Sequence, residues 1–583
     1  MPTPPGTRYL RVYVTLAALV SIGRPAMGQQ PPAADRQADT RPVDTLALAR
    51  EVPRLIRASA VPGLSMAVVQ RGRVVWTGAF GTVNDSAKTP LDAGTVFEAA
   101  SLSKPVFAYL VLRLAGRGEF DLDRPLYELL DYPRVVHDER YKQITARVVL
   151  SHGSGLPNWG GETMTSRFDP GSAYGYSGEG FVFLQKTLEH VTGRSLEELA
   201  RRDVFEPLGM TRSSFVWQDR FAGDVAYARD WLWHNAPVNR YVEANAAYTL
   251  LTTAADYGRF VGALLAGRGL SPAMWKSFLA PVRETSPGIS IGLGIRLEDG
   301  PDGRIFYHSG NNGRRFTGYM MGDIEKGRGL VYFASAANGT SLVRALSSRV
   351  FGNGYSPRHW SDFYRSDDPH LLAVRSVERA AVAGGGDAAR NRIREIAANP
   401  ATRPSLEDTW ELGAFLAGRG LTALSIEILE NAVADAPDSA AAHLALGGAF
   451  ESAGDFQKAI ESYRRADSLE GGSGDAPRRI EWAQARLAAR ERPVSVSQRT
   501  LKRYEGLYQE RGITLREGRL YYRRGANPES PLTPMTEDLF EIEANPSLRV
   551  RFVTRGQEPA DQLVEIDSDG TIDESTRSPG TAP

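Results

Sequence analysis

The chain has 583 residues, more than one hydrophobic core usually supports, so about three domains are expected. Lysine and arginine balance aspartate and glutamate at 69 each, and no basic stripe with interleaved aromatic residues is present, so the sequence predicts no nucleic-acid partner. The chain contains no cysteine, which excludes disulfides, thiolate catalysis and cysteine-ligated metals.

The N-terminus has the pattern of a secretory signal peptide, predicted over residues 1–28. Arg8 and Arg11 precede an apolar run over 12–22, and small residues follow at 26–28. This run is too short to favour a membrane span, so we expect no stable span after cleavage. The predicted location is the periplasm or the exterior of a bacterial cell. The alternative is an amphipathic N-terminus on a cytosolic protein.

The first predicted domain covers residues 40–365 and begins with two strands, over 64–70 and 74–80, joined by a tight turn. Further strands are predicted late in this region, over 289–297, 304–308, 316–321 and 329–334. Short adjacent strands imply an antiparallel sheet, and helical segments between the early and late strands imply an α+β fold.

Between these strands lies the tetrapeptide Ser101-Leu102-Ser103-Lys104, which leads into an apolar run. If a helix begins at Ser101, Lys104 lies beside its hydroxyl group. An amine can remove the serine proton when its pKa is depressed, and burial against the apolar side of the helix would lower that pKa. The pattern therefore predicts a nucleophile and its base, although S-x-x-K alone also occurs by chance.

Two further motifs follow along the chain. Tyr176-Ser177-Gly178 comes after a turn-rich stretch and opens a segment with helical apolar spacing. His308-Ser309-Gly310 ends a predicted strand and runs into a polar turn. A tyrosine at a loop-to-helix junction can hold a proton in a site, and small residues at a strand end allow a substrate to lie alongside the strand.

Residues 366–492 are alanine-rich and helical in period, and they match themselves at a spacing of 34 residues. Leu412-Gly413 corresponds to Leu446-Gly447, and Ala432 corresponds to Ala466. This spacing resembles the tetratricopeptide repeat, which would make the region a possible binding site for a protein partner. An unrelated pair of helical hairpins is the alternative.

Residues 494–575 return to strand-like alternation, including 501–508, 513–516, 519–523 and 548–553. This pattern predicts a small antiparallel β barrel or sandwich. Residues 576–583 are expected to form a disordered tail.

The ordered set of motifs in residues 45–360 resembles the serine β-lactamase and penicillin-recognising enzyme superfamily, in its class C-like branch. The segments that carry the resemblance are Phe97–Lys104, Leu150–Pro157, Tyr176–Gly178, Glu206–Thr211, Leu251–Tyr257 and His308–Gly310. The implied fold is α+β: a serine β-lactamase/transpeptidase-like domain with an antiparallel sheet flanked by helices. The helical repeat region and the small β domain follow it.

The resemblance also implies roles for individual residues. Ser101 would be the nucleophile that becomes acylated, Lys104 the base or proton shuttle, and Tyr176 the hydroxyl that relays a proton to the leaving group. His308 stands where the family has a lysine or histidine that polarises the site and helps to position a substrate carboxylate.

The oxyanion hole implied by the resemblance consists of the backbone N–H groups of Ser101 and Asn311. Two such donors can each lower the barrier by about 3 kcal/mol. Ser309, Gly310 and Gly178 are the expected substrate-binding positions.

One position departs from the family pattern, because Gly178 stands where the second motif usually has asparagine. In the family that amide bonds to the lysine and to the acyl side chain of β-lactam or peptide substrates. Its loss puts efficient β-lactam hydrolysis in doubt and affects simple esters less.

Several other residues near the motifs are weaker candidates for a role in the site. His152 is expected to be structural and Glu179 a solvated charge, whereas Trp231 and Trp233 could wall the cleft. Arg314 or Arg315 could bind a substrate carboxylate, and the alternative is that both are solvated turn residues. No H-E-x-x-H motif occurs and the histidines lack metal-ligand spacing, so neither a metal nor another cofactor is expected.

The sequence thus predicts an exported serine hydrolase that cleaves an ester or amide through an acyl-enzyme at Ser101. One alternative is a D-specific peptidase, DD-carboxypeptidase or β-lactamase acting on cell-wall-type substrates. A second alternative is a catalytically silent scaffold that acts through its helical repeats.

Overall fold

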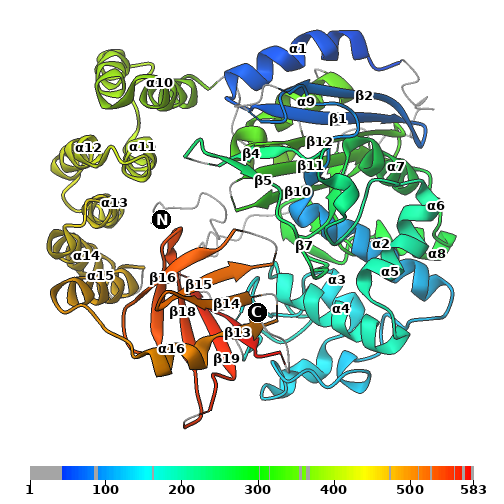
Figure 1. The fold of residues 1–583 in the computed structure, drawn as a ribbon. Coiled ribbons are helices and arrows are strands. Elements are labelled where there is room, and N and C mark those ends of the chain that lie inside the picture. The colour runs from blue at the N-terminus through cyan, green and yellow to red at the C-terminus, as the bar shows by residue number, and fades with distance from the viewer. Residues whose placement is uncertain are drawn as a thin grey trace, which may run out of the picture.

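The computed structural model describes residues 42–84, 89–160, 163–230, 232–300, 303–313, 315–352, 357–362, 368–471, 475–509, 511–525, 528–556, 558–567 and 572–578. The predicted signal peptide lies outside these residues. Three bodies are visible in Figure 1: a sheet with helices, a column of helices and a barrel-like sheet.

The N-terminal body is built on an antiparallel sheet whose strand order is β2-β1-β12-β11-β10-β9-β8-β7. The N-terminal hairpin lies at one edge because β1 pairs with β12, with Leu64 opposite Ala334. This confirms the predicted antiparallel sheet. The strands are β1 (Gly63–Gln70), β2 (Arg73–Gly81), β7 (Arg283–Ser286), β8 (Ile289–Ile291), β9 (Arg296–Gly300), β10 (Gly303–Asn312), β11 (Phe316–Asp323) and β12 (Arg328–Ala334).

Helices cover both faces of this sheet, and the period-2 alternation of strand side chains explains why (Figure 1). On β1, Met66 and Val68 pack with α1 (Thr45–Ala58) and α9 (Val343–Phe351). Ala67 and Val69 point to the opposite face, which is covered by α2 (Ser103–Gly116) and α7 (Ala254–Leu265). The central strands are therefore buried on both faces.

The remaining elements of this body are short or lie at its periphery. They are β3 (Phe97–Glu98), η1 (Ala100–Leu102), η2 (Leu126–Glu128), η3 (Glu139–Gln143), α3 (Ala146–Leu150), α4 (Gly178–Thr192), α5 (Leu196–Ala200), the π-helical η4 (Arg201–Phe205), α6 (Glu206–Leu208), η5 (Asp219–Phe221), β4 (Tyr227–Arg229), β5 (Asn235–Pro237), β6 (Leu251–Thr252), α8 (Pro272–Phe278), η6 (Ala337–Leu342) and η7 (Arg358–Asp362).

Two predicted strands differ from the structure. The predicted strand over 289–297 is divided into β8 and β9 by a turn in which Gly294 has a φ of 83°, a value that favours glycine. β10 does not end at Gly310 but continues to Asn312, because Asn311 and Asn312 still pair with β11. The third motif therefore lies within a strand rather than at its end.

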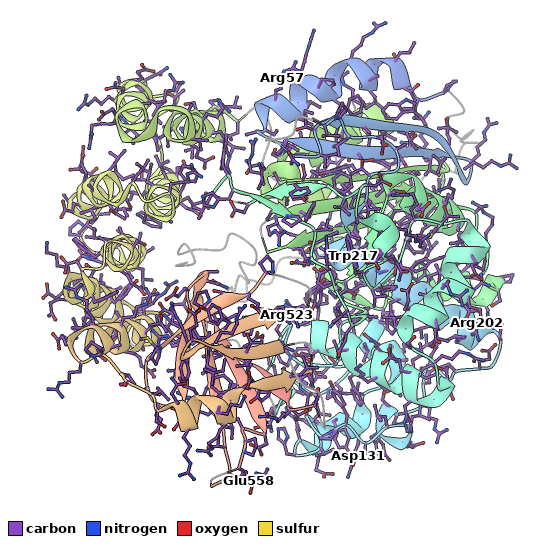
Figure 2. All side chains as sticks on the ribbon, viewed as in Figure 1. Arg57, Asp131, Arg202, Trp217, Arg523 and Glu558 are labelled. Carbon is purple, nitrogen blue, oxygen red and sulfur yellow. The ribbon has the colours of Figure 1, made fainter. Side chains whose placement is uncertain are left out.

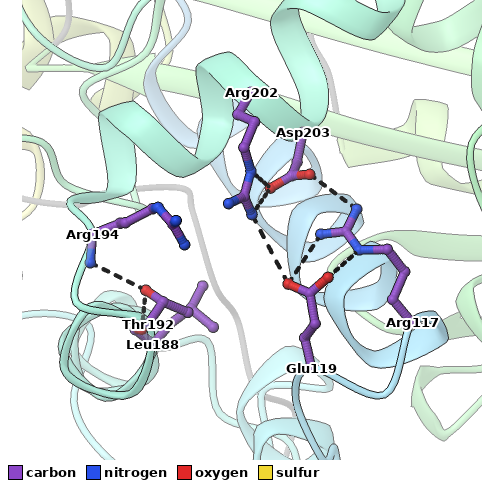
Figure 3. Close-up of polar contacts among 7 residues, drawn as sticks. All are labelled: Arg117, Glu119, Leu188, Thr192, Arg194, Arg202 and Asp203. Atoms are coloured by element: carbon purple, nitrogen blue, oxygen red, sulfur yellow. Dashed lines mark hydrogen bonds and ion pairs between the residues drawn. The ribbon is translucent and has the colours of Figure 1, made fainter.

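An ion-pair network fixes the C-terminal end of α2, the helix that begins beside Ser101 (Figure 3). Arg117 binds Glu119 at 2.6 Å and Asp203 at 2.9 Å, and Arg202 also pairs with Asp203. Since Asp203 lies on η4, the network joins α2 to the helical layer around it.

The helices of the second body are α10 (Pro369–Ala398), interrupted by non-helical Gly385, and α11 (Leu406–Gly418), α12 (Thr422–Asp435), α13 (Ala440–Ser452), α14 (Phe456–Glu470) and α15 (Ala476–Glu491). They form the column on one side of Figure 1. Gly413 and Gly447, which are 34 residues apart, lie against Leu429 and Tyr463, where a Cβ atom would clash. The tetratricopeptide assignment stays a prediction.

The third body is a nearly closed antiparallel sheet in which the strands follow one another in sequence order. It confirms the predicted β domain. The elements are α16 (Gln498–Tyr504), β13 (Gly506–Tyr508), β14 (Arg511–Arg516), β15 (Arg519–Arg524), β16 (Ser530–Pro534), β17 (Leu539–Ile542), β18 (Asn545–Val553), β19 (Gln562–Asp567) and β20 (Ile572–Thr576).

Two details of the predicted β domain are wrong. The segment expected as one strand over 501–508 begins as helix α16, whose N-terminus Ser497 caps by accepting from the Thr500 N–H, and only 506–508 form a strand, β13. At the start of the predicted tail, Arg577 forms a bridge with Tyr508 that nearly closes the barrel, and residues 579–583 lie outside the described residues.

The helical column contacts both other bodies. Arg419 donates to the Leu232 carbonyl of the N-terminal body at 3.0 Å. On the barrel side, Arg486 pairs with Glu541 at 2.8 Å, and the Arg549 guanidinium stacks 3.5 Å above the Trp482 ring. These contacts fix the barrel beside the N-terminal sheet.

Candidate active site

Ser101 lies in the short helix η1 between strand β3 and helix α2. The preceding residue, Ala100, has a φ of 49°, a left-handed conformation that alanine rarely adopts. Such local strain persists only where the surrounding structure enforces it. Here β10 supplies that support, because a Cβ atom at Gly310 would lie 2.5 Å from the Ala99 carbonyl oxygen and 3.1 Å from the Ser101 nitrogen.

Gly310→Ala should therefore displace the Ser101 turn or β10. We expect a loss of roughly 1–3 kcal/mol in the free energy of unfolding, as for other overpacked sites, together with at least tenfold lower kcat. Urea denaturation and steady-state kinetics measure the two effects. Gly223→Ala is the matched control, because nothing lies within 4 Å of a Cβ atom there. Equal behaviour of the two variants would contradict the packing argument.

Lys104 is buried one helical turn after Ser101, as the S-x-x-K spacing predicts. Its Nζ atom lies 3.4 Å from Ser101 Oγ and donates to the Ala247 carbonyl at 3.0 Å. Burial lowers the pKa of Lys104 from 10.5 to about 7. A large fraction of these side chains is therefore neutral near physiological pH, and a neutral amine can accept the serine proton.

Tyr176 lies in the loop before α4 and approaches the Lys104 amine. Its ring centroid is 4.7 Å from Lys104 Nζ, and the Ser101 side chain acts on its hydroxyl group by lowering the pKa of Tyr176. Burial raises the pKa of Tyr176 to about 12, and the Ser101 hydroxyl opposes this effect only in part. At neutral pH Tyr176 therefore carries its proton, so Lys104 is the better base.

His152 packs against the ring of Tyr176. The two rings stack with centroids 4.4 Å apart, and His152 Nδ1 accepts from the Ser177 N–H at 3.1 Å. His152 also has a left-handed φ of 52°. Sequence reasoning treated it as structural, and the structure places it in contact with the second motif, where it orients the tyrosine ring.

His308 lies on β10 and is buried beside the site. Its Nδ1 atom is 2.8 Å from the Ser309 carbonyl oxygen, which makes Nδ1 the protonated nitrogen and Nε2 an acceptor. Burial, together with the charges of Lys104 and Arg296, lowers the pKa of His308 to about 3. The His308 imidazole is therefore neutral near pH 7. It cannot hold a substrate carboxylate through an ionic interaction, which is the role that the resemblance implied.

The proposed oxyanion-hole residues come from adjacent elements. Ser101 lies in η1, and Asn311 follows Gly310, which packs directly against that turn. Asn311 and Ser309 are both exposed, so the surface of β10 beside Ser101 is open to a ligand. Gly310, by contrast, is buried and acts as a spacer rather than as a contact surface.

Gly178 has a steric reason to lack a side chain. A Cβ atom there would lie 2.6 Å from the Asn158 carbonyl oxygen and 2.8 Å from the Trp159 ring. The Gly178 N–H instead donates to Asn158, at 3.0 Å to Oδ1. The loop at 158–159 thus occupies the space that an asparagine side chain at 178 would need.

Two lesser expectations fail. Glu179 is not a solvated charge but is buried and pairs with Arg134 at 2.7 Å. Trp233 packs with the helical column and donates to Glu378 at 3.2 Å, so it does not wall the cleft. Trp231 and Arg314 lie outside the described residues.

Sequence reasoning missed Glu98, which is buried three residues before Ser101. Its carboxylate accepts from the Asn239 N–H at 2.6 Å, from the Tyr241 hydroxyl at 2.9 Å and from the Asn312 amide. Glu98 thereby ties the end of β10 to the segment at 239–241. The only sequence signal was a charged residue inside the otherwise apolar lead-in to the first motif.

The arrangement joins an alcohol, a buried amine of lowered pKa and a protonated phenol in one partly exposed cluster. Such a cluster can form a covalent acyl intermediate and pass a proton to a leaving group. Among the described residues no group of His, Asp and Glu side chains could hold a metal ion. None of the described helices has the length and apolar character needed to cross a bilayer.

Parts of this chain are similar in sequence to several known proteins. Penicillin-binding protein 4* of Bacillus subtilis is 26% identical over 334 residues, which cover 49% of this chain and 71% of that protein. Esterase EstB of Burkholderia gladioli is 29% identical over 28% of this chain and 49% of its own length. D-aminopeptidase of Gluconobacter oxydans is 27% identical over 28% of this chain and 34% of its own.

Among solved structures, the octameric penicillin-binding protein homologue of Pyrococcus abyssi matches at 16% identity and a TM-score of 0.44, covering 91% of this chain and 99% of that one. D-alanine carboxypeptidase AmpC of Burkholderia cenocepacia matches at 19% identity and a TM-score of 0.46, covering 53% and 98%.

The family model described as Beta-lactamase matches residues 48–350, which contain all four proposed catalytic side chains. The helical column and the barrel lie outside this match. With the matched segment covering more than half of the sequence, the chain belongs to the Beta-lactamase family of serine hydrolases.

Proposed function

We propose that the protein is an exported serine hydrolase that cleaves esters through an acyl-enzyme at Ser101. The observation that carries the proposal is the 3.4 Å separation between Ser101 Oγ and a buried lysine whose pKa is about 7. A lysine base needs both this proximity and this pKa to work near neutral pH. Similarity to an esterase and to peptidases supports the reaction class.

In the acylation step, Ser101 Oγ attacks the substrate carbonyl carbon while its proton passes to Lys104 Nζ. The N–H groups of Ser101 and Asn311 stabilise the oxyanion. Tyr176 then gives its proton to the leaving oxygen or nitrogen and regains one from Lys104, and the bond to the leaving group breaks. Water attacks the acyl-enzyme by the reverse proton path, with His308 Nε2 available as a hydrogen-bond acceptor.

The preference for esters over β-lactams is supported by Gly178. The loop at 158–159 fills the place of the amide that would bind an acylamino side chain. Esters need fewer amide contacts and have better leaving groups. Steady-state assays on p-nitrophenyl esters, nitrocefin and D-alanyl peptides test this preference. Nitrocefin hydrolysis at a high kcat/KM would overturn it.

Tyr176→Phe keeps the ring that stacks on His152 but removes the proposed proton relay. We expect kcat to fall about 10²-fold on an alkyl ester, and much less on a p-nitrophenyl ester, whose leaving group needs no proton. Tyr174→Phe is the matched control, because the Tyr174 hydroxyl bonds to Arg296 at 3.2 Å instead. Equal losses on both esters would argue that Tyr176 only shapes the site.

A D-specific peptidase or carboxypeptidase is the second candidate. One observation favours it: Arg315 lies three residues beyond the end of β10 and could bind a peptide carboxylate. Product analysis with D- and L-terminated peptides separates the two readings, since release of a D-amino acid at a rate above ester turnover would favour the peptidase.

A further inference from the structure

A cavity of about 280 Å³ opens between the barrel and the N-terminal body, which carries Ser101 and is called the catalytic body from here on. Its lining comes from three segments that are far apart in sequence. These are the segment 239–248 and the end of β10 in the catalytic body, and the end of β15 in the barrel. The lining residues are Asn239, Arg240, Tyr241, Tyr248, Asn312, Gly313, Arg315, Arg524 and Gly525.

Two residues of the cavity lining are chain neighbours of residues in the proposed site. Asn312 directly follows the proposed oxyanion-hole residue Asn311 on β10. Tyr248 directly follows Ala247, whose carbonyl accepts from Lys104. The Trp159 ring, which blocks Gly178, packs edge-on against Tyr248 with centroids 5.4 Å apart. A substrate acylating Ser101 could therefore extend into this space.

The lining is cationic: it contains three arginines and no carboxylate. Arg240 is exposed and stacks on Trp217, with its guanidinium carbon 4.6 Å from the ring centroid. Arg315 donates to the Asn239 amide oxygen at 3.3 Å and to the Pro237 carbonyl, which are both uncharged. Within the described residues neither of these two arginines has a carboxylate partner. Glu98, which lies behind this lining, is buried and accepts hydrogen bonds from Asn239, Tyr241 and Asn312.

The third arginine comes from the barrel and is held in place by a buried network. Arg524 Nη1 lies 3.3 Å from Glu565, a carboxylate that also accepts from Arg511 at 3.0 Å and from the Tyr522 hydroxyl. Arg511 and Glu565 are both buried inside the barrel. Glu565 thus holds the base of Arg524 within the barrel wall, at the end that faces the cavity.

The barrel approaches the catalytic body at the residue after Arg524. Gly525 has a φ of 57°, and a Cβ atom there would lie 3.4 Å from the Arg240 carbonyl oxygen. Figure 2 labels the neighbouring Arg523 at the side of the barrel that faces the catalytic body. The hairpin end therefore contacts the segment that carries Arg240, Tyr241 and Tyr248.

We propose that the C-terminal barrel completes the substrate site, with Arg524 binding a carboxylate of the ester or amide substrate together with Arg240 and Arg315. The tyrosine rings at 241 and 248 pack against the part of the substrate between this carboxylate and the scissile carbonyl. Guanidinium groups suit this task because they bind carboxylates through charge-assisted, often bidentate hydrogen bonds. The proposal rests on the proposed function of Ser101.

The test compares matched anionic and neutral esters in the full-length protein. In the first pair the charge is on the acyl side: mono-p-nitrophenyl glutarate is the anionic ester and p-nitrophenyl pentanoate is its neutral partner. In the second pair the charge is on the leaving-group side: para-acetoxybenzoate is the anionic ester and its methyl ester is the neutral partner. In at least one pair, Arg524→Gln should lower kcat/KM for the anionic ester roughly tenfold while changing the neutral ester less than about twofold. Arg240→Gln should act in the same direction on the same pair.

Arg551→Gln is the matched control, because Arg551 is a half-exposed barrel arginine that lies 3.8 Å from its own carboxylate, Asp538. Its anionic-to-neutral ratio should equal that of the wild type. Unchanged ratios in Arg524→Gln and Arg240→Gln for both pairs would overturn the proposal. A fall shared by both esters of a pair, or by Arg551→Gln, would also overturn it, because it would indicate a loss of folding.

A binding measurement separates this proposal from the proposed function. Ser101→Ala protein cannot turn over an ester by the proposed route, but it should still bind para-acetoxybenzoate in calorimetry, and adding Arg524→Gln should weaken this binding roughly tenfold. If para-acetoxybenzoate binds but the wild-type protein shows no Ser101-dependent turnover, the arginine site stands and the proposed hydrolase function is rejected. Ser101-dependent turnover with no effect of Arg524 on rate or binding would reject the arginine site alone.

Discussion

Ser101→Ala should abolish ester hydrolysis and covalent labelling by a fluorophosphonate. Removing the nucleophile of an enzyme that works through an acyl intermediate costs roughly 10⁴-fold or more in kcat, because the remaining groups can only polarise the carbonyl. Intact-mass spectrometry should show one added label on the wild-type chain and none on Ser101→Ala. Peptide mapping should place that label on residue 101.

Ser172→Ala serves as the control, because the Ser172 hydroxyl is exposed and, among the residues that the structure describes, bonds only to the Asp169 carbonyl in its own turn. It should label and turn over like the wild type. If folded wild-type protein takes no label from the fluorophosphonate or from a fluorescent penicillin, the catalytically silent scaffold becomes the better interpretation. The helical column would then be the part to test for a protein partner.

Lys104→Met should remove activity while making the protein more stable. Methionine fills a similar volume without a charge, so the proton acceptor is lost and kcat should fall at least about 10³-fold. At the same time, a buried amine that prefers to be charged opposes folding near neutral pH. The free energy of unfolding at pH 7 should rise by roughly 2–4 kcal/mol in the variant, as measured by urea denaturation.

The sign of this effect follows from the lowered pKa. Between about pH 7 and 10.5 the unfolded chain binds a proton at Lys104 that the folded chain releases. Wild-type stability from this group therefore rises with pH across that window. The stability difference between Lys104→Met and the wild type should shrink on going from pH 7 to pH 10. A variant that loses both activity and stability at pH 7 would show that Lys104 is structural.

The same pKa predicts the acid limb of the rate profile. Because only the neutral amine can accept the Ser101 proton, kcat/KM should rise with pH through about 7 and then level off. Tyr176, whose pKa is about 12, and His308, whose pKa is about 3, contribute no titration in that range. An acid limb near pH 4 would point to a carboxylate instead of the lysine.

The sequence by itself determined most strands of the catalytic sheet, though not β7 or the division of 289–297, as well as the Ser101–Lys104 pair and the helix that follows Tyr176. Each of these depends on contacts within a few residues, so apolar periodicity and motif spacing predict them. The barrel was predictable as a class for the same reason. Its exact elements were not, since the cap at Ser497 outweighed the strand-like alternation of the residues after it.

Only the tertiary structure decided how the site is charged. The neutrality of His308 and the burial of Glu98 and Glu179 depend on segments that meet after folding, and no local pattern records how deeply a side chain is buried. Arg240 and Arg524 are 284 positions apart in the chain, yet they line one cavity. Desolvation and Coulomb energies are set by distance in space, so the chemistry of this cavity becomes visible only once the barrel lies beside the catalytic sheet.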